Sequence, residues 1–238
     1  MGTKSLKPLY EINGKTTLER ILDTLDKLGS DILTPILVVR PDTKKIYQEK
    51  FSKRAKIITA SAKGTGYAVR AAQKTAAKAK HILPLYGDHP FIQANTLKQL
   101  IRFHRNHGEV LTMMTVEVPS YRGIYEGCKS FGRIIRDKRN RVLEIREAHE
   151  CSPAQLRIRE VNPALYLMNA PWVWNALARI PKHPNGEYFL PDVLKIAAED
   201  KLPYKVLKTQ DALSAMGYNT PEDLERLVFF AQKKEKKG

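Results

Sequence analysis

Short apolar segments that alternate with helix-like segments constrain the fold of this chain more than any other feature. Residues 35–40 and 56–60 are two such segments, and a third, residues 82–88, ends abruptly in Gly87-Asp88. Strands that are apolar throughout and separated by helices are typical of a parallel sheet covered on both faces. We therefore predict an α/β fold with a Rossmann-like, mostly parallel sheet flanked by helices.

The segment 82–88 predicts a buried strand that carries one carboxylate to the edge of this sheet. In open α/β sheets, ligands bind outside the carboxyl ends of the strands. Asp88 would therefore lie where a metal or a phosphate-bearing substrate is held. A strand-ending turn with a solvated Asp88 is the alternative, and the segment alone leaves it open.

The remaining elements follow from apolar spacing, capping residues and turn signals. Helices are predicted at 17–28, after Pro41-Asp42-Thr43, at 64–80, from Asn95 or Thr96 onward, after Pro171, at 189–199 and from Pro221 onward. Strands are predicted at 6–12, 110–118, 131–136, 142–147, 161–168 and 205–209. Past Gly108 the strands no longer alternate with helices, which indicates an antiparallel insertion. No linker or repeat divides the chain, so one domain over residues 1–238 is expected, with a basic tail at 233–238.

Charge and cysteine content limit the classes of partner. The formal net charge is +16, but the lysines are scattered and no aromatic-interleaved basic motif is present, so nucleic acid is not expected as the main partner. No apolar stretch approaches the roughly 18 residues of a membrane span, and no membrane partner is expected. Cys128 and Cys151 lack metal-site spacing, and we interpret them as reduced thiols of a cytoplasmic protein.

Eight short segments carry a resemblance to a known family. They are Lys7-Pro8-Leu9 with Gly14-Lys15, Gly64-Thr65-Gly66, Leu85-Tyr86-Gly87-Asp88, Phe131-Gly132-Arg133-Ile134, Glu147, Val161-Asn162, Gly186-Glu187-Tyr188 with Asp192, and Gly217-Tyr218-Asn219. In this order they closely resemble the nucleotidyltransferase domain of the N-acetylglucosamine-1-phosphate uridylyltransferase family, within the wider sugar-phosphate nucleotidyltransferases. Each segment alone is weakly specific, but together they cover nearly the whole chain.

The resemblance implies a reaction and its catalytic groups. A sugar-1-phosphate oxygen would attack the α-phosphorus of a nucleoside triphosphate, UTP by resemblance, and pyrophosphate would leave. Asp88 and Asn219 match the ligands of Mg²⁺, a hard cation usually held by one or two protein groups and by substrate phosphates. Lys7 matches a lysine that contacts the phosphates. The resemblance therefore implies that Lys7 and Asp88 are the catalytic residues.

The resemblance also assigns binding residues. For the nucleotide these are Gly64, Thr65, Tyr86 and Gly87, where small residues let the backbone approach a ligand. For the sugar phosphate they are Gly132, Glu147, Asn162 and Tyr188. A purely structural role stays open for several of these positions. Gly64-Thr65 could be a glycine-rich helix start, Gly132 a hairpin glycine, Glu147 a surface residue, Asn162 a strand-edge residue and Tyr188 a core residue.

The chain also departs from the family pattern. The family's first strand and its loop L-x-x-G-x-G-T-R-M precede the matched lysine, and Met1 corresponds to the last letter of that loop. We expect that a central strand and a phosphate loop are missing, which would leave two neighbouring strands with open apolar edges. The hypothesis is that the natural product is longer, and that the chain as given is at most weakly active.

Substrate choice stays open at the sequence level. Thr59 stands where uridylyltransferases usually carry a base-reading glutamine, and Pro163-Ala164 and Pro191 replace residues near the sugar. A cytidylyltransferase, a molybdenum-cofactor guanylyltransferase type, and a noncatalytic nucleotide- or RNA-binding remnant are the alternatives. The oligomeric state is not indicated.

Overall fold

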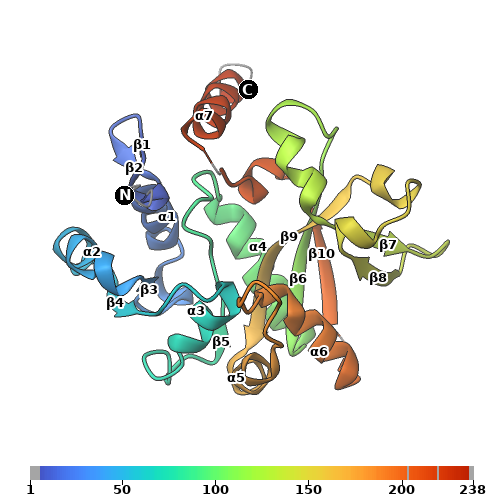
Figure 1. Cartoon of the computed structure of the whole chain (residues 1–238), viewed down its shortest axis with the longest axis horizontal. Helices are drawn as coiled ribbons and strands as arrows, with labels where there is room; N and C mark the ends of the chain where they lie inside the picture. Colours follow the sequence, from blue (N-terminus) through green and yellow to red (C-terminus); the bar gives the residue numbers. More distant parts are fainter. Residues whose placement is uncertain (1–5, 203, 219, 236–238) are drawn as a thin grey trace.

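A mixed sheet forms the centre of the molecule (Figure 1). The computed structural model describes residues 6–202, 204–218 and 220–235. The strand order is β10 (Tyr204–Thr209), β6 (Leu111–Glu117), β9 (Glu160–Asn169), β7 (Gly132–Arg136) and β8 (Val142–Arg146), and β5 (His81–Ile82) also pairs with β9. Two further pairs lie apart, the hairpin of β1 (Glu11–Ile12) with β2 (Lys15–Thr16) and the parallel pair of β3 (Ile36–Val39) with β4 (Lys56–Thr59).

Helices cover both faces of the central sheet because its strands are apolar on both sides. Met114, Leu165 and Leu167 pack against α4 (Ala94–His107) and α1 (Thr17–Asp26). Met113, Tyr166 and Met168 pack against α5 (Ala170–Arg179) and α6 (Val193–Glu199). Successive strand residues point to opposite faces, so this alternation places the two methionines of β6 in different layers. The result is a three-layer α/β arrangement.

The α/β class, the flanking helices and the antiparallel β7–β8 insertion are confirmed, but the parallel character of the sheet was overestimated. Among the described strands, only β10–β6 and β3–β4 are parallel pairs. The long strand β9 runs antiparallel to β5, β6 and β7. The central sheet is therefore mixed, because β9 runs antiparallel to all three of its neighbours while β10 and β6 are parallel.

Two elements at the start of the chain follow local rules. Asn13 and Gly14 have φ of 50° and 74° and form the turn between β1 and β2, as their sequence indicates. Thr16 then caps α1 in a capping box, in which its side chain accepts from the Glu19 backbone and the Glu19 side chain accepts from the Thr16 backbone. Residues 7–9, expected to be extended, form a 3₁₀ turn.

Two predicted elements are much shorter than expected. The strand predicted at 82–88 is limited to β5, because residues 83–86 have no paired strand beside them in the described chain. The helix predicted at 64–80 is α3 (Thr65–Ala71) followed by turns. The alanine- and lysine-rich segment after Ala71 offers few large apolar side chains, and helices of this length depend on packing more than on propensity.

The other helices begin close to their predicted positions. α4 begins after Gln93 rather than at a cap on Asn95 or Thr96, since the Thr96 hydroxyl donates to Asp211 instead. α2 (Lys44–Phe51) covers β3 and β4, and α7 (Pro221–Glu235) includes the first residues of the predicted basic tail, whose last residues 236–238 lie outside the described chain. No helix in the described ranges is long and apolar enough to cross a membrane.

The β3–β4 pair is separate from the central sheet. The β3–β4 pair lies with α1 and α2 on one side of the molecule, at the blue end of the colour scale in Figure 1. Within the described chain it has no ladder to the central sheet. All four residues of β3, Ile-Leu-Val-Val, are only partly buried, although so apolar a strand is normally covered on both faces.

Candidate active site

Lys7 and Asp88 come together through contacts between distant segments. Pro8 packs on Gly87 so closely that a Cβ atom at Gly87 would lie 2.9 Å from Pro8 Cγ. The Tyr218 hydroxyl donates to the Lys7 carbonyl, and the Tyr218 backbone N–H donates to the Asp88 carbonyl at 3.3 Å. Three segments from the two ends and the middle of the chain therefore meet at Asp88.

Tyr218 is a residue of this site that sequence reasoning missed. It is buried, stacks on Tyr10 at 6.0 Å between ring centroids, and its hydroxyl lies 2.9 Å from Thr17 Oγ1. Burial raises its pKa to about 12, so the hydroxyl stays protonated. Its place in Gly217-Tyr218-Asn219 was the available signal. Asn219 itself lies outside the described residues, and its role as a metal ligand stays a prediction.

The Asp88 side chain is partly open to solvent. It is 33% exposed, and Nε2 of His89 lies 3.8 Å from its Oδ1. Burial lowers the pKa of His89, and the charge of Asp88 opposes this shift. His89 also packs against Gly217, where a Cβ atom would lie 2.7 Å from its ring.

The donor set at Asp88 fits one class of metal better than another. Among the described residues, no three histidine, cysteine or acidic side chains group together as a metal site. That pattern does not suit a fully protein-ligated transition metal. One accessible carboxylate does suit Mg²⁺, which keeps several waters and takes its other ligands from substrate phosphates.

Gly64 and Thr65 are interlocked with the segment around Tyr188. Gly64 has φ of 90°, and a Cβ atom there would lie 2.5 Å from the Tyr188 carbonyl oxygen. The Tyr188 N–H donates to Lys63 at 2.8 Å, and the Gly66 N–H donates to Tyr188 at 2.9 Å. The Leu190 N–H donates to Thr65 Oγ1 at 3.0 Å. Packing against Tyr188 is therefore sufficient to require glycine at 64.

A small pocket opens beside this junction. Its volume is about 320 Å³, and its walls include Gly64, Thr65, Arg40 and the 60–62 segment after β4. This size is at the lower end of small-molecule sites. Arg40, which sequence reasoning missed, follows β3 directly and pairs with Asp42 at 3.2 Å. The pocket thus lies at the carboxyl ends of β3 and β4, where α/β folds bind ligands.

Tyr86 connects the Asp88 region with this pocket. Its hydroxyl is hydrogen-bonded to Thr65, and its ring stacks on His89 at 5.2 Å. Burial raises its pKa to about 12, so Tyr86 is a neutral donor at physiological pH. The hydrogen bond between Tyr86 and Thr65 therefore joins the two segments that carry the predicted nucleotide-binding residues, Gly64-Thr65 and Tyr86-Gly87.

Gly132, Glu147 and Asn162 form a second group. Gly132 is paired with Asn162 between β7 and β9, and a Cβ atom at Gly132 would lie 3.5 Å from Glu147 Oε1. The buried Asn162 side chain donates to the Tyr166 hydroxyl at 2.7 Å and accepts from the Ala164 N–H at 2.9 Å. Burial and nearby acidic groups raise the pKa of Glu147.

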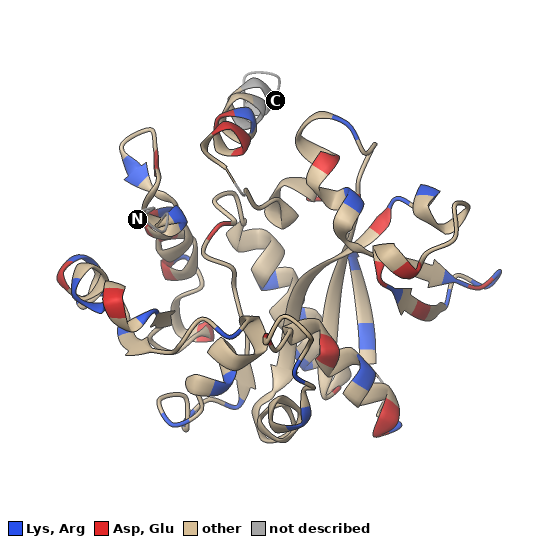
Figure 2. Cartoon of the chain, viewed as in Figure 1, with Lys and Arg blue, Asp and Glu red and all other residues tan. Residues whose placement is uncertain are grey.

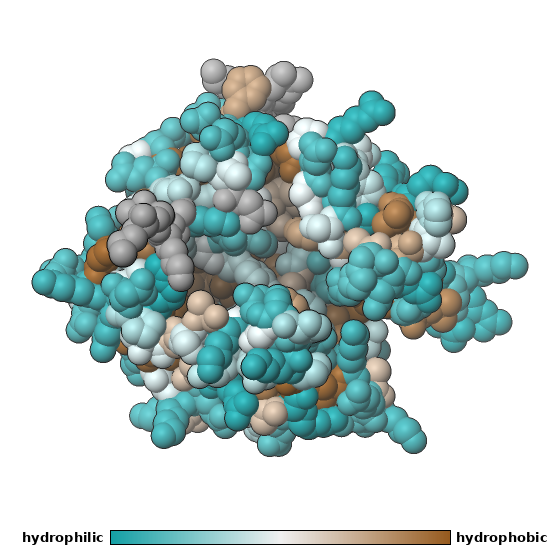
Figure 3. Space-filling view, viewed as in Figure 1, coloured by the Kyte–Doolittle hydropathy of each residue, from teal (hydrophilic) through white to brown (hydrophobic). Residues whose placement is uncertain are grey.

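A buried carboxylate adjoins this second group. Asp192 is 6% exposed and its Oδ2 lies 2.7 Å from His183 Nε2. The hydroxyl of the buried Tyr166 interacts electrostatically with Tyr86, Glu147 and Asp192. Tyr166 therefore links the group around Tyr86 with the group around Glu147. His183 was not anticipated, because its pairing with Asp192 depends on the fold of the loop between α5 and α6. Figure 3 shows a hollow near the middle of one face, with hydrophobic atoms in its depth.

Comparison with known proteins gives the context of these residues. The family model described as the MobA-like NTP transferase domain matches residues 1–184. The relative from Thermoanaerobacter pseudethanolicus named bifunctional protein GlmU is 31% identical over 82% of this chain and 41% of its own length. The protein of the same name from Shouchella clausii is 31% identical over 92% of this chain and 47% of its own length. The chain spans about half the length of the curated relatives it matches.

Two solved structures share the fold. A CMP:2-keto-3-deoxy-manno-octonic acid synthetase in complex with CTP superposes with a TM-score of 0.67 at 14% identity, covering 98% of this chain and 95% of that chain. The 4-diphosphocytidyl-2C-methyl-D-erythritol synthase of Anaerococcus prevotii superposes with a TM-score of 0.65 at 16% identity, covering 95% of this chain and 91% of that chain. Their titles name a synthetase bound to CTP and a synthase of a diphosphocytidyl compound. With a family model that matches most of its length and a nucleotidyltransferase fold, the chain belongs to the family of MobA-like NTP transferase domains.

Proposed function

We propose that this protein transfers a nucleotidyl group from a nucleoside triphosphate, UTP in the first instance, to a sugar-1-phosphate such as N-acetylglucosamine-1-phosphate, with release of pyrophosphate. The proposal is supported by the meeting of the Lys7-Pro8 and Gly87-Asp88 segments, which Tyr218 and the Pro8–Gly87 contact join. Curated relatives named bifunctional protein GlmU support the choice of a uridylyl donor.

On the donor side, the protein has to hold a triphosphate and its base. Asp88, with Asn219 as the further candidate, would hold Mg²⁺, which when bound neutralises phosphate charge. Lys7 supplies a cation for the phosphates, since an ammonium group suits these ligands as a point charge. The pocket beside Gly64 and Thr65 is the candidate site for the base, and the neutral hydroxyl of Tyr86 stiffens its wall.

On the acceptor side, Gly132, Glu147, Asn162 and Tyr188 are the candidate contacts. The missing side chain of Gly132 leaves room next to the Glu147 carboxyl, which can accept hydrogen bonds from sugar hydroxyls. Asn162 is held by two internal hydrogen bonds, so we assign it chiefly to shaping this wall. Holding both phosphates in line is the main catalytic contribution that such a site offers, and no protein nucleophile is needed.

A second candidate is a transferase with another base or acceptor. The two structural neighbours act on cytidine nucleotides by their names, and the matching family model is MobA-like. Thr59, at the end of β4 near the small pocket, stands where a base-reading glutamine was expected. A cytidylyl or molybdenum-cofactor guanylyl transfer is the resulting alternative.

Pyrophosphate release from a panel of nucleoside triphosphates and sugar phosphates, measured on the protein in the presence of Mg²⁺, tests the proposal. We expect release with UTP and an amino-sugar phosphate. Replacement of Asp88 by Asn should reduce it at least 10²-fold, the usual loss when one group that stabilises the transition state is removed. The matched control is Asp26→Asn, which removes an exposed carboxylate paired with Arg54 and should leave release unchanged. Salt-sensitive RNA binding without any pyrophosphate release would overturn the proposal.

A further inference from the structure

Tyr218 joins the two segments that carry the candidate catalytic residues. Its hydroxyl donates to the Lys7 carbonyl, although 211 positions separate the two residues, and its backbone N–H donates to the Asp88 carbonyl at 3.3 Å. Both bonds go to backbone carbonyls, so they set the course of the chain at Lys7 and at Asp88. One residue therefore fixes the distance between the two segments.

The hydroxyl of Tyr218 has a defined direction. Thr17 Oγ1 lies 2.9 Å from it, closer than to the Tyr10 carbonyl at 3.3 Å. Because the tyrosine hydroxyl gives its single proton to the Lys7 carbonyl, the Thr17 hydroxyl is the donor in this second bond. The buried ring also stacks on Tyr10, whose own N–H donates to the Lys7 carbonyl at 2.9 Å. The hydroxyl is thus oriented toward Lys7 by its surroundings.

The segment that leads to Tyr218 is itself fixed to the core. Gln93, the residue before α4, makes no capping bond with its own side chain. Its N–H donates instead to Ser214 Oγ at 2.9 Å, and the Thr96 hydroxyl donates to Asp211 at 2.7 Å. Ser214 and Asp211 precede Tyr218 by only a few residues. Tyr218 is therefore presented from a segment that is held on the N-terminus of α4.

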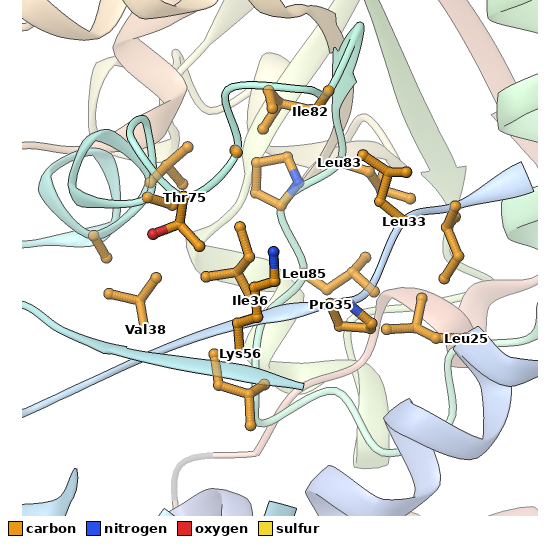
Figure 4. Close-up of a pocket in the computed structure, with 18 of the residues that line it drawn as sticks. Leu25, Leu33, Pro35, Ile36, Val38, Lys56, Thr75, Ile82, Leu83 and Leu85 are labelled. Atoms are coloured by element: carbon orange, nitrogen blue, oxygen red, sulfur yellow. The ribbon is translucent and has the colours of Figure 1, made fainter. Parts of the chain in front are cut away.

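Apolar packing holds the turn of residues 7–9 only in part. Pro8 packs closely on Gly87, but it also borders an apolar groove of about 1240 Å³. Figure 4 shows Leu83 and Leu85 lining this groove on the segment that leads to Gly87. No residue of the turn itself is buried. The position of the turn consequently depends on hydrogen bonds more than on enclosure by side chains.

We propose that Tyr218 is a positioning residue for the transfer reaction. Its hydroxyl keeps the Lys7 segment docked on the Asp88 segment, so that both candidate catalytic groups act on the same phosphates. The catalytic part of this role rests on the proposed function, whereas the docking of the two segments does not. A displacement of about 1 Å in groups that hold the reactants can lower a rate about 10²-fold. The loss of this one hydroxyl should therefore lower kcat.

Amide hydrogen exchange of the Tyr218→Phe variant tests the docking. The change removes the hydroxyl but keeps the ring on Tyr10 and the backbone N–H on Asp88. We expect exchange at least tenfold faster at Leu9 and Tyr10, the two amides that close the 3₁₀ turn, because local opening becomes easier. Amides of β6, in the buried sheet, should exchange as in the native protein.

Tyr121→Phe is the matched control. The Tyr121 hydroxyl also donates to a backbone carbonyl, that of Ile158, but it has no bond to the Lys7 or Asp88 segment in the described chain. Its loss should leave exchange at Leu9 and Tyr10 unchanged. Exchange at these two amides that is unchanged in Tyr218→Phe, or equally fast in both variants, overturns the proposal.

The kinetics of pyrophosphate release test the catalytic part, with the nucleoside triphosphate and sugar phosphate that the native protein uses best. Tyr218→Phe should lower kcat by about 10- to 100-fold with less than a threefold change in KM for the sugar phosphate, and Tyr121→Phe should change neither. Thr17→Val should lower kcat less, and Thr17→Ser should restore it. The double variant Thr17→Val with Tyr218→Phe should lose no more than Tyr218→Phe alone, because both act through one hydroxyl.

The two failures are distinguishable. A native protein that releases no pyrophosphate contradicts the proposed function, and the exchange comparison then decides on the docking alone. An active native protein whose Tyr218→Phe variant keeps its kcat, or changes only KM for the sugar phosphate, overturns the positioning role. Urea unfolding of each variant is measured in parallel. Should Tyr218→Phe fail to fold, Thr17→Val against Thr17→Ser decides, and equal exchange and kcat in these two variants overturns the proposal.

Discussion

At the residue scale, three glycines hold the candidate site together by close backbone contact. A Cβ atom would collide with Tyr188 at Gly64, with Pro8 at Gly87 and with His89 at Gly217. Each of these contacts joins segments that are far apart in the chain. The requirement for glycine at these positions therefore comes from packing between segments, in addition to any approach of a ligand.

Replacement of Gly64 by Ala should destabilise the protein strongly. The change imposes both a positive φ of 90° on a residue with a side chain and a contact of 2.5 Å with the Tyr188 carbonyl. At Gly64 ψ is 170°, a backbone region that is essentially limited to glycine. A side chain there costs about 1–3 kcal/mol, and overpacking a further 1–3 kcal/mol. Gly29→Ala is the control, since Gly29 has φ of 56° and open space around its Cα. Urea unfolding should show the larger loss for Gly64, and equal losses would contradict the packing argument.

The sequence anticipated part of this site. Motif order pointed to Lys7, Asp88, Gly64 and Gly132, and these residues lie where the two groups of the site form, although their roles stay predictions. Tyr218, Arg40 and His183 were not anticipated. Their importance comes from partners such as Lys7 and Asp192 that only folding brings near, and a local pattern carries no information on such contacts.

Buried His104 should make the stability of the protein depend on acid. Its Nδ1 lies 2.8 Å from Thr112 Oγ1 and its Nε2 lies 3.1 Å from His81 Nδ1. Burial lowers the pKa of His104 from 6.5 to about 4. Below pH 6.5 the unfolded chain therefore binds a proton at His104, whereas the folded chain binds it only near pH 4. The contribution of His104 to the free energy of unfolding is complete above pH 6.5 and is lost as the pH falls from 6.5 toward 4.

The measurement for His104 is the free energy of unfolding at pH 7 and pH 4.5. Linkage at 1.36 kcal/mol per pH unit gives a loss of about 2 kcal/mol from this residue. The His104→Gln variant should lack that part of the loss, whereas His107→Gln, at the exposed end of α4, should keep it. An identical pH dependence in His104→Gln and the native chain would refute the assignment.

At the scale of elements, periodicity predicted the strands and helices well where packing is regular. Four elements lie close to their predicted ranges: β6, β9, α1 and α5. The apolar residues of each element follow the spacing of its own secondary structure. β5 and α3 were predicted too long. The strand depends on a neighbour that the described chain lacks, and the alanine-rich helix depends on apolar contacts that its sequence does not provide.

The capping box of α1 offers a test at this scale. The Glu19 N–H donates to Thr16 Oγ1 at 3.1 Å, and the Thr16 N–H donates to the Glu19 carboxylate at 2.7 Å. The Thr16 N–H and the Thr16 hydroxyl both donate to the Glu19 carboxylate, and these two bonds lower the pKa of Glu19. Thr16→Ala should cost about 1 kcal/mol of unfolding free energy in urea, the usual value for an N-cap. Ser30→Ala, at an exposed position without such a role, should be neutral, and equal costs would count against the cap.

At the scale of the whole molecule, charge and burial are distributed differently. Lys and Arg lie over all parts of the view in Figure 2, mixed with Asp and Glu, which agrees with a generally basic surface rather than a dedicated patch. Burial is concentrated in the central sheet, where the first six residues of β6 are fully buried. By contrast, every residue of β3 and β4 is half-buried or exposed, although residues of α1 and α2 that pack against these strands are buried.

This asymmetry predicts that the β3–β4 part opens before the rest of the protein unfolds. Local opening requires less free energy where few apolar contacts are broken. In the described chain, β3 and β4 have no ladder to the central sheet and depend on α1, α2 and α3 for packing. Native-state hydrogen exchange in low urea should give amides of 36–39 and 56–59 an opening free energy at least about 2 kcal/mol below that of β6 and β9. Their opening should also depend less on urea, because less surface is exposed. Equal opening free energies and equal urea dependence in both parts would show that the divided sheet unfolds as one cooperative unit.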